Sequence, residues 1–589
     1  MNSIIEEKLR EIEDTGYFEF MFEAAKMFEE VAQISRELKV PEVWKKAERE
    51  AKLLSLMVYN PIIDEDYKQR FHIQSSQFSK EDIKYFENRL EESSNIFLKN
   101  RYSDFLLEYG EGITSKKKFE IGKLHVELVI QTAEAHFEKG QYLSSIEDFA
   151  RAVNVSLHFN NKELVNKSIT SLFNIFLILP EKESRWFLEA SKIARQVISG
   201  RMKEIVNEET RKNIYEKLEQ GREFFWNCQE HHLHRVFCEE LIQWVKANKI
   251  DPKKIEDYLR GIGDSYEAES EHQQGRAEKT ELVKAHFLEE ALQHSIRYGF
   301  TDKFDDLKLR IKKSYEQAKE NGEFIPISTS VKISKKDLQK EFKPYLDVKL
   351  EEAILYFGRE ATFIPDIERI RKDTIEQSSI FSLRNLMSRS IVSDGKKIFQ
   401  AVDDEDNLKV NLNENYMRYM QTTAVILMAP LFEELIERGL NAQHIIDQIN
   451  NWEYIGEENK EFIKVGVERL FEKDYISSLH ILVPQFEDVI RGFFHKLGFV
   501  TTSIKKGTAQ HEQTFNEFLE RQDIKEVLPE RTHKYIQILM VEQTGSNLRN
   551  KIAHGLINSS ECNLMNNILV LHLYLVLTTL TISVKEKDE

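Results

Sequence analysis

The chain has 589 residues, and its 83 Lys and Arg against 100 Asp and Glu give a formal charge of −17. This charge argues against a protein that coats nucleic acid non-specifically, because such binding depends on Lys and Arg that neutralise phosphates. The 10 prolines and 22 glycines fall below the usual shares of roughly 5% and 7%. With 41% hydrophobic residues, the composition excludes disorder and favours long helices.

The cysteines and the N-terminus indicate the compartment. Cys228, Cys238 and Cys562 are too few for a disulfide framework. The opening MNSIIEEKLREIED is acidic and amphipathic, whereas a signal peptide would be basic and then apolar. We therefore expect a cytoplasmic protein.

Residues 1–320 read as successive amphipathic helices. In one stretch, apolar residues recur every three or four positions and predict a buried stripe: Phe18, Phe22, Ala25, Phe28, Val31 and Ala32. Residues 133–156 resemble the helix–turn–helix spacing of a tetratricopeptide unit, with Gly140 at the turn. We predict an irregular α-solenoid, a scaffold of the kind that holds a protein partner or senses a trigger.

Two breaks divide the chain further. Helical periodicity stops at 321–334, where Gly, Pro and β-branched residues cluster. The segment 401–415 is acidic and rich in Asn, and we predict a loop there. The predicted organisation is a helical-repeat region at 1–320, a linker and middle region at 321–415, and a helical domain at 416–589.

Several common catalytic motifs are missing from the sequence. It has no GxxxxGK[ST] phosphate loop, GxGxxG, GxSxG, HExxH or paired CxxC. Nucleotide hydrolysis by a phosphate loop, dinucleotide redox chemistry and the commonest serine hydrolase and zinc protease designs are unsupported.

A group of Cys and His side chains raises the possibility of zinc. Cys228, His231 and His232 share a helix face, but His234 and Cys238 point elsewhere at that period. A zinc site needs four convergent ligands. We therefore predict a partly buried helix with solvated histidines, and we expect no metal or other cofactor.

The segment 568–584 carries no Asp, Glu, Lys or Arg. Its 17 residues lie at the lower edge of membrane-spanning length. We predict a core helix of a bundle or a helix at a subunit interface, and membrane association is the weaker alternative.

The segment that carries chemistry is GSNLRNKIAHGLINSSE at 545–561. It contains Arg549, Asn550 and His554 as R-N-x-x-x-H on a predicted short helix. Gly545 and Ser546 offer the turn and N-cap, Gly555 offers the stop, and Ser559 or Ser560 caps the final helix. Asn550 and His554 lie four residues apart and so share one helix face.

This motif resembles the signature of the HEPN superfamily, which is Arg, a polar residue, and His four to six residues after the Arg. The upstream segment 474–499 is similar to the first helix of the family and carries Glu487 and Arg491 as supporting residues at i, i+4. The resemblance covers 416–589 and implies a four-helix bundle. More loosely, the region from about 345, with 382–395, is similar to a bacterial family of unassigned function that ends in this domain.

The resemblance implies metal-independent cleavage of RNA. The 2′-hydroxyl of RNA attacks the neighbouring phosphodiester, so the protein needs only to move protons and stabilise charge. Histidine exchanges protons near neutral pH, and arginine presents a permanent charge to phosphate oxygens. Arg549, Asn550 and His554 would be the catalytic residues, and two motifs would meet in a homodimer. The expected setting is a regulated antiviral-defence or toxin-like effector.

Two other interpretations stay open. Arg549 pairs with Glu487 and His554 is a satisfied interhelical histidine, in which case the protein is a non-catalytic interaction or dimerisation protein. A membrane-associated regulator is the weaker one. The apolar final segment also predicts the homodimer, because a helix that is apolar all round must bury more than one face.

Overall fold

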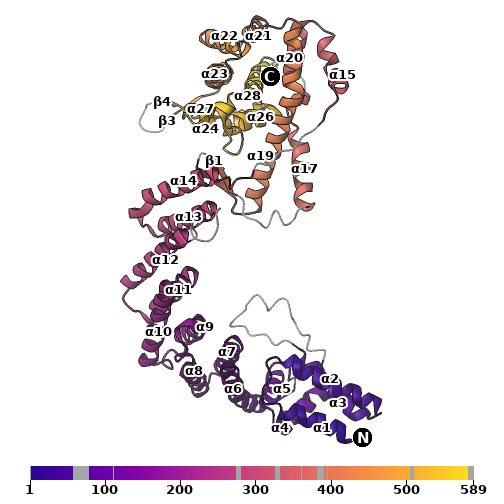
Figure 1. The fold of residues 1–589 in the computed structure, drawn as a ribbon, viewed down its shortest axis with the longest axis vertical. Coiled ribbons are helices and arrows are strands. Elements are labelled where there is room, and N and C mark those ends of the chain that lie inside the picture. Colours follow the sequence, from indigo (N-terminus) through magenta and orange to yellow (C-terminus); the bar gives the residue numbers. More distant parts are fainter. Residues whose placement is uncertain are drawn as a thin grey trace, which may run out of the picture. The chain divides into compact units, whose positions relative to one another are not determined.

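The computed structural model describes residues 2–56, 78–110, 112–272, 280–325, 332–359, 361–380, 390–393, 395–504 and 510–580. In these ranges the chain is mostly helical, and its strands form two short antiparallel hairpins (Figure 1). The expectation of a mostly helical protein is therefore confirmed. The chain divides into two compact units, Met1–Ile311 and Lys312–Glu589.

Most helices of the first unit pack against the next helix along the chain, as in a solenoid. The boundary with the second unit falls within the last of them. They are α1 (Asn2–Asp14), α2 (Met21–Glu37), α3 (Pro41–Leu54), α4 (Lys80–Glu92), α5 (Ile96–Tyr109), α6 (Ser115–Glu138), α7 (Tyr142–His158), α8 (Lys162–Phe176), α9 (Arg185–Ser199), α10 (Glu208–Asn227), α11 (His231–Asn248), α12 (Lys253–His272), α13 (Glu281–Tyr298) and α14 (Phe304–Glu320).

The predicted helix–turn–helix at 133–156 is present as α6 and α7. Gly140 makes the turn with φ +76°, a conformation that costs glycine little. Phe149 and Ala152 are fully buried in the core that α6, α7 and later helices share. The aromatic and small residues of the pattern therefore allow two helices to pack closely.

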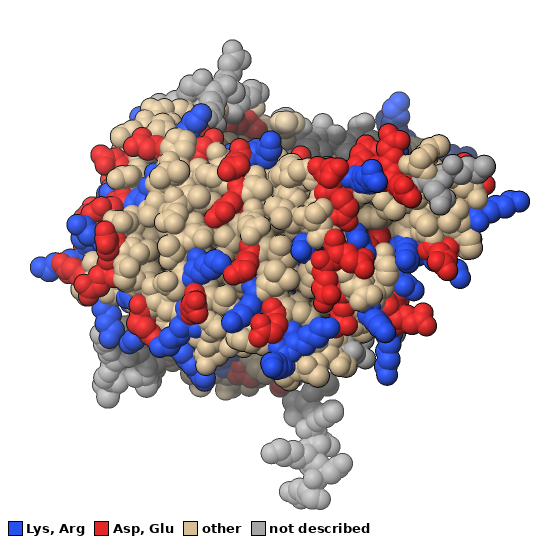
Figure 2. Space-filling model, turned by 90° about the horizontal axis from the view of Figure 1, so that it is seen from below, with Lys and Arg blue, Asp and Glu red and all other residues tan. Residues whose placement is uncertain are grey.

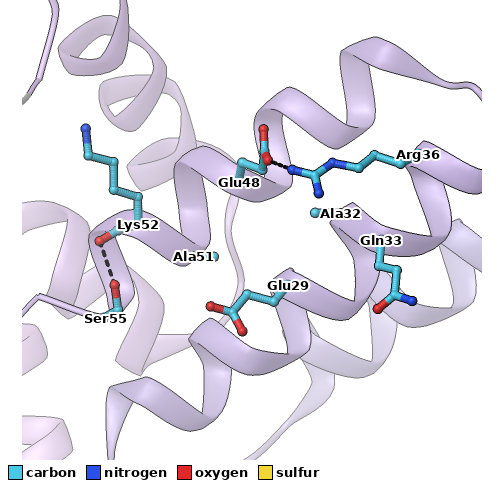
Figure 3. Close-up of a pocket in the computed structure, with 8 residues that line it drawn as sticks. All are labelled: Glu29, Ala32, Gln33, Arg36, Glu48, Ala51, Lys52 and Ser55. Atoms are coloured by element: carbon cyan, nitrogen blue, oxygen red, sulfur yellow. Dashed lines mark hydrogen bonds and ion pairs between the residues drawn. The ribbon is translucent and has the colours of Figure 1, made fainter.

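The predicted apolar stripe is present on α2 from Ala25 onwards, whereas Phe18 is buried but precedes the helix, which begins at Met21. Phe28, Val31 and Ala32 are buried, but Phe22 is exposed and stacks on Phe20 with ring centroids 5.7 Å apart. Ala32 faces the hollow between α2 and α3 that Figure 3 shows, where Arg36 pairs with Glu48. Phe22 lies at the edge of the apolar stripe, so it is the residue that stays exposed when the stripe packs.

The second unit is built around one core. Its elements are α15 (Lys335–Leu346), α16 (Leu350–Arg359), α17 (Ile367–Ile380), β1 (Ser390–Ser393), β2 (Lys396–Gln400), α19 (Asp404–Thr423), the π-helical η7 (Ala424–Met428), α20 (Ala429–Glu437), α21 (Ala442–Asn450), α22 (Glu457–Phe471), α23 (Tyr475–Lys496), β3 (Thr502–Ile504), β4 (Gln510–Glu512), α24 (Phe515–Glu520), α25 (Gln522–Val527), α26 (Glu530–Met540), α27 (Leu548–Ala553) and α28 (Leu564–Leu577).

The prediction of a loop at 401–415 is wrong, because α19 occupies most of this segment. Asp403 caps the helix by accepting a hydrogen bond from the Asp406 backbone N–H at 2.9 Å. The Asn side chains are not solvated but buried, and Asn415 donates to Thr374 of α17 at 2.8 Å. Acidic residues at a helix start and buried, paired Asn side chains produce a helix from a composition that is typical of loops.

The middle region shares the core of the C-terminal helices. Phe342, Phe357 and Ile370 belong to the same buried cluster as the residues of α23 and α28. The structural division thus lies at 311/312, whereas the sequence suggested boundaries at 320 and 415. Residues 382–389 and 394, part of the segment compared with a bacterial family, lie outside the described residues.

The final apolar segment forms α28, and the prediction of a core helix is confirmed. All residues of α28 from Asn566 to Leu577 are buried. The covering elements belong to the same unit and include α16, α23, α26 and η7. The subunit interface that we expected here is therefore not needed, because a single chain already buries every face of the helix.

Membrane insertion gains no support from the helices. None that the structure describes is both long enough and apolar enough to cross a bilayer. The helix ends at Leu577, short of the predicted end, and residues 581–584 lie outside the described part of the chain.

Candidate functional site

The motif lies on the short helix α27, between α26 and α28 in the sequence. Gly555 ends this helix with φ +65°, as predicted. The predicted caps are wrong by one to four residues: Asn547, with φ +53°, precedes α27, and the side chain of Asn563 caps α28. Asn tolerates the left-handed conformation better than Ser, so Asn547 makes the sharp entry to the helix.

The side chains of Arg549, Glu487 and Arg491 meet in one cluster. Arg549 Nε donates to Glu487 Oε2 at 2.6 Å. Arg491 Nη2 donates to Glu487 Oε1 at 2.8 Å, as the i, i+4 spacing on α23 predicted. One carboxylate thus holds two guanidinium groups and joins α27 to α23.

This cluster is partly shielded from water. The side chains of Arg491, Glu487 and Arg549 are 9%, 16% and 27% exposed. Arg491 also donates to the backbone oxygen of Gln513 at 2.6 Å, and its guanidinium lies 5.1 Å from the ring centroid of Phe518. Arg491 is therefore anchored on three sides, whereas Arg549 is the member with the most access to solvent.

Asn550 is used to shape the turn. Its Nδ2 donates to Asn547 Oδ1 at 2.8 Å, and its Oδ1 accepts from Arg549 Nη1 at 3.2 Å. The amide therefore braces both the entry to α27 and the neighbouring arginine. In the described part of the chain this side-chain amide makes no hydrogen bond to the imidazole of His554, so it does not orient that histidine.

His554 lies exposed at the end of α27. Its backbone N–H bonds to the Asn550 carbonyl at 3.0 Å. No group among the described residues forms a hydrogen bond with its imidazole. The structure therefore does not bear out a satisfied interhelical histidine, and the imidazole is open to a ligand from solution.

The five predicted site residues thus fall into two sets. Glu487, Arg491, Arg549 and Asn550 form one hydrogen-bonded network, and His554 stands outside it at the other end of a six-residue helix. The sequence did not single out Asn547 or the Gln513 carbonyl. The signal available for Asn547 was its place directly before the predicted helix, because Asn is common at helix starts.

The Cys and His residues near α11 divide between the interior and the surface of the first unit, because His231, His234 and Cys238 are buried whereas Cys228 and His232 are exposed. His234 Nε2 lies 3.4 Å from Cys238 Sγ, and both residues are buried. His231 is buried as well, so the prediction of solvated histidines is wrong for these two imidazoles, and burial lowers the pKa of each. In the described part of the chain no three His, Cys, Asp or Glu side chains are grouped to hold a metal ion.

Comparison with known proteins gives no family for the chain. It matches no protein-family model, no curated protein and no solved structure. The chemistry of Arg549 and His554 must therefore be argued from their own geometry.

Proposed function

We propose that the second unit is a HEPN-like helical domain that cleaves RNA without a metal ion. Arg549 and His554 are the catalytic residues, and Asn550, Glu487 and Arg491 position them. The first unit, a tetratricopeptide-like solenoid, senses a trigger or binds a protein partner. The protein acts in the cytoplasm as a regulated defence or toxin-like effector, and RNA is its substrate.

The observation that carries this proposal is the unequal environment of the two key residues. A histidine kept for packing would be buried and hydrogen-bonded, as His572 is. His554 instead is exposed at the end of α27, and near the start of the same helix Arg549 is held by Glu487 while 27% of its side chain stays exposed. A held arginine and an open imidazole are what a phosphate substrate needs from a protein.

The chemistry requires only groups that this chain supplies. The 2′-oxygen of the substrate attacks phosphorus while a base removes its proton, and the bond to the 5′-oxygen breaks as that oxygen gains a proton. His554 would move one of these protons, and Arg549 would stabilise the charge on the phosphorane. A second His554 from a homodimer partner would serve the other proton, which is why we retain the dimer in the proposal.

The alternative is a non-catalytic interaction protein, and one observation favours it. Arg549 already has a carboxylate partner on another helix, so a structural role satisfies it fully. On this account the cluster locks α27 onto α23, and the solenoid provides the binding activity.

Purified protein incubated with mixed RNA in EDTA distinguishes the two accounts. Cleavage should persist in EDTA and leave 2′,3′-cyclic phosphate or 3′-phosphate ends, because the 2′-hydroxyl is the nucleophile. Products with 5′-phosphate ends, or dependence on added Mg²⁺ or Mn²⁺, would exclude this mechanism.

A further inference from the structure

A second place in the C-terminal unit combines a hollow with basic side chains. It measures about 280 Å³, is lined by residues of α17, α19, α25 and α26, and includes no residue of α27. Its lining consists of Ile367, Arg371, Leu412, Lys525, Glu530, His533, Lys534 and Gln537. The lining thus has three cationic side chains and one carboxylate, in a chain whose total charge is −17.

Lys534 is the distinctive member of this lining. Its ammonium donates to Asn413 Oδ1 and Gln537 Oε1, both at 3.0 Å, and these acceptors are neutral. Within the described residues it forms no ion pair. Burial lowers the pKa of Lys534, because the charged form is poorly solvated there. The carboxylates of Glu542 and Glu520 act on this ammonium only through space, and the cations of Lys409 and Arg371 oppose them. An anion in the hollow would be the first direct ionic partner of Lys534 among the described residues.

The other two cations stand at the rim. Arg371 pairs with Glu368 at 2.5 Å and with Glu530 at 3.9 Å, and Lys525 pairs with Glu520 at 2.7 Å. Of these three carboxylates, only Glu530 lines the hollow. Both cations are partly exposed, with side-chain exposures of 47% and 36%. They can therefore turn towards an incoming anion at little cost, since exposed ion pairs contribute only about 0–1 kcal/mol.

We infer that this hollow is a binding site for a phosphate monoester. A monoester carries about −1.5 to −2 charges at pH 7, which matches the lining better than the single charge of a carboxylate. Arginine offers a planar fork to phosphate oxygens, and lysine offers a point charge. The volume of about 280 Å³ lies just below the roughly 300–1,000 Å³ of ligand pockets, so the hollow accommodates only a small head group.

Calorimetric titration of the full-length protein with sodium phosphate tests this site, with chloride added to hold the ionic strength constant. We expect saturable binding that weakens at least tenfold in Lys534→Gln and in Arg371→Gln. Lys460→Gln is the matched control, because Lys460 lies on α22 outside the hollow and pairs with Glu457. Arg371 is exposed, so its variant is expected to fold even if Lys534→Gln does not.

Absence of saturable binding to the folded protein would overturn the proposal, and so would equal affinities in the three variants. His554→Ala should bind phosphate like the wild type, so the phosphate site can fail or survive independently of the proposed ribonuclease.

Two paired titrations identify the source of the phosphate. Preference for AMP over adenosine assigns the site to a small phosphomonoester, and preference only for a 5′-phosphorylated over a 5′-hydroxyl RNA oligomer assigns it to an RNA end. No preference within either pair would contradict a monoester site.

Discussion

Glu487 is the residue on which the geometry of the motif depends. It is 16% exposed and accepts hydrogen bonds from arginines on two helices. From the sequence, an exposed i, i+4 pair with Arg491 would contribute about 0.3–0.5 kcal/mol. In the structure Glu487 is also partly buried and accepts a second hydrogen bond, from Arg549. Removal of the Glu487 carboxylate therefore leaves two guanidinium groups without this acceptor.

Glu487→Ala is therefore expected to lower the free energy of unfolding of the second unit by about 2 kcal/mol, in the range for an unsatisfied buried polar group. Chemical denaturation followed by circular dichroism measures this loss. Glu512→Ala is the control, because Glu512 is 64% exposed and lies 3.8 Å from Arg491. An equal loss in both variants would contradict the bridging role of Glu487.

His554 and Arg549 should differ in their effect on stability. His554→Ala should change the free energy of unfolding by less than roughly 0.5 kcal/mol, as for a surface substitution. Arg549→Ala should cost more, about 1–2 kcal/mol, because Glu487 and Asn550 lose a partner. Denaturation curves of the two variants measure this difference, and a large loss for His554→Ala would favour a structural histidine.

The helices show how far the sequence predicts this fold. The helix–turn–helix at Gly140 and the apolar stripe of α2 follow from periodicity, since a helix hides its apolar face. The burial of α28 follows from the absence of charged residues over 568–584. The network of Glu487 with Arg549 depends on two helices that only the tertiary fold brings together. The helix α19 was missed because its buried Asn side chains find partners on other elements, and composition does not reveal such partners.

The start of α19 depends on an N-cap, and the contribution of this cap can be measured separately from that of the buried Asn side chains. Asp403 accepts a hydrogen bond from the Asp406 backbone N–H at 2.9 Å. Asp403→Ala should therefore cost about 1 kcal/mol of stability, as loss of an N-cap does. Asp404→Ala removes the same charge one residue later without removing the cap, and it should cost less in the same denaturation assay. Equal costs would attribute the effect to charge alone.

Helix α28 makes the second unit sensitive to acid. His572 is fully buried, its Nε2 lies 3.1 Å from the Phe357 carbonyl oxygen, and burial lowers its pKa to about 3. In the unfolded chain a histidine has a pKa of about 6.5. The unfolded state therefore binds the proton first, so stability is full above pH 6.5 and falls as the pH drops towards 3.

Replacement of His572 by Gln should flatten this decline between pH 6.5 and 4, whatever it costs at neutral pH. The free energy of unfolding of the second unit, measured across this pH range, gives the slope. His480→Gln replaces an exposed histidine of the same unit and should leave the slope unchanged. A slope that persists in His572→Gln would assign the acid sensitivity to other groups.

At the scale of the whole molecule, the structure changes the argument for a dimer. Leu575 and Leu577 are buried against their own chain, and a Cβ added to Gly358 would lie 2.8 Å from the Leu575 backbone oxygen. A charge at Leu575 is expected to unfold the second unit and not merely to split a dimer, because an unpaired charge in the core costs several kcal/mol.

Light scattering and circular dichroism of Leu575→Lys check this expectation. A folded monomer obtained from a dimeric wild type would restore α28 as the interface.

The face shown in Figure 2 carries acidic and basic side chains interspersed, so it offers no single-signed patch for RNA or for an acidic partner.

The most direct test of the account is cleavage of RNA in EDTA by the wild type and by His554→Ala, both shown to be folded by circular dichroism. We predict that the wild type leaves 2′,3′-cyclic phosphate ends and that His554→Ala loses at least a hundredfold in rate, the lower end for loss of a proton-transfer group. Equal rates for the two proteins would contradict the assignment of the site to Arg549 and His554.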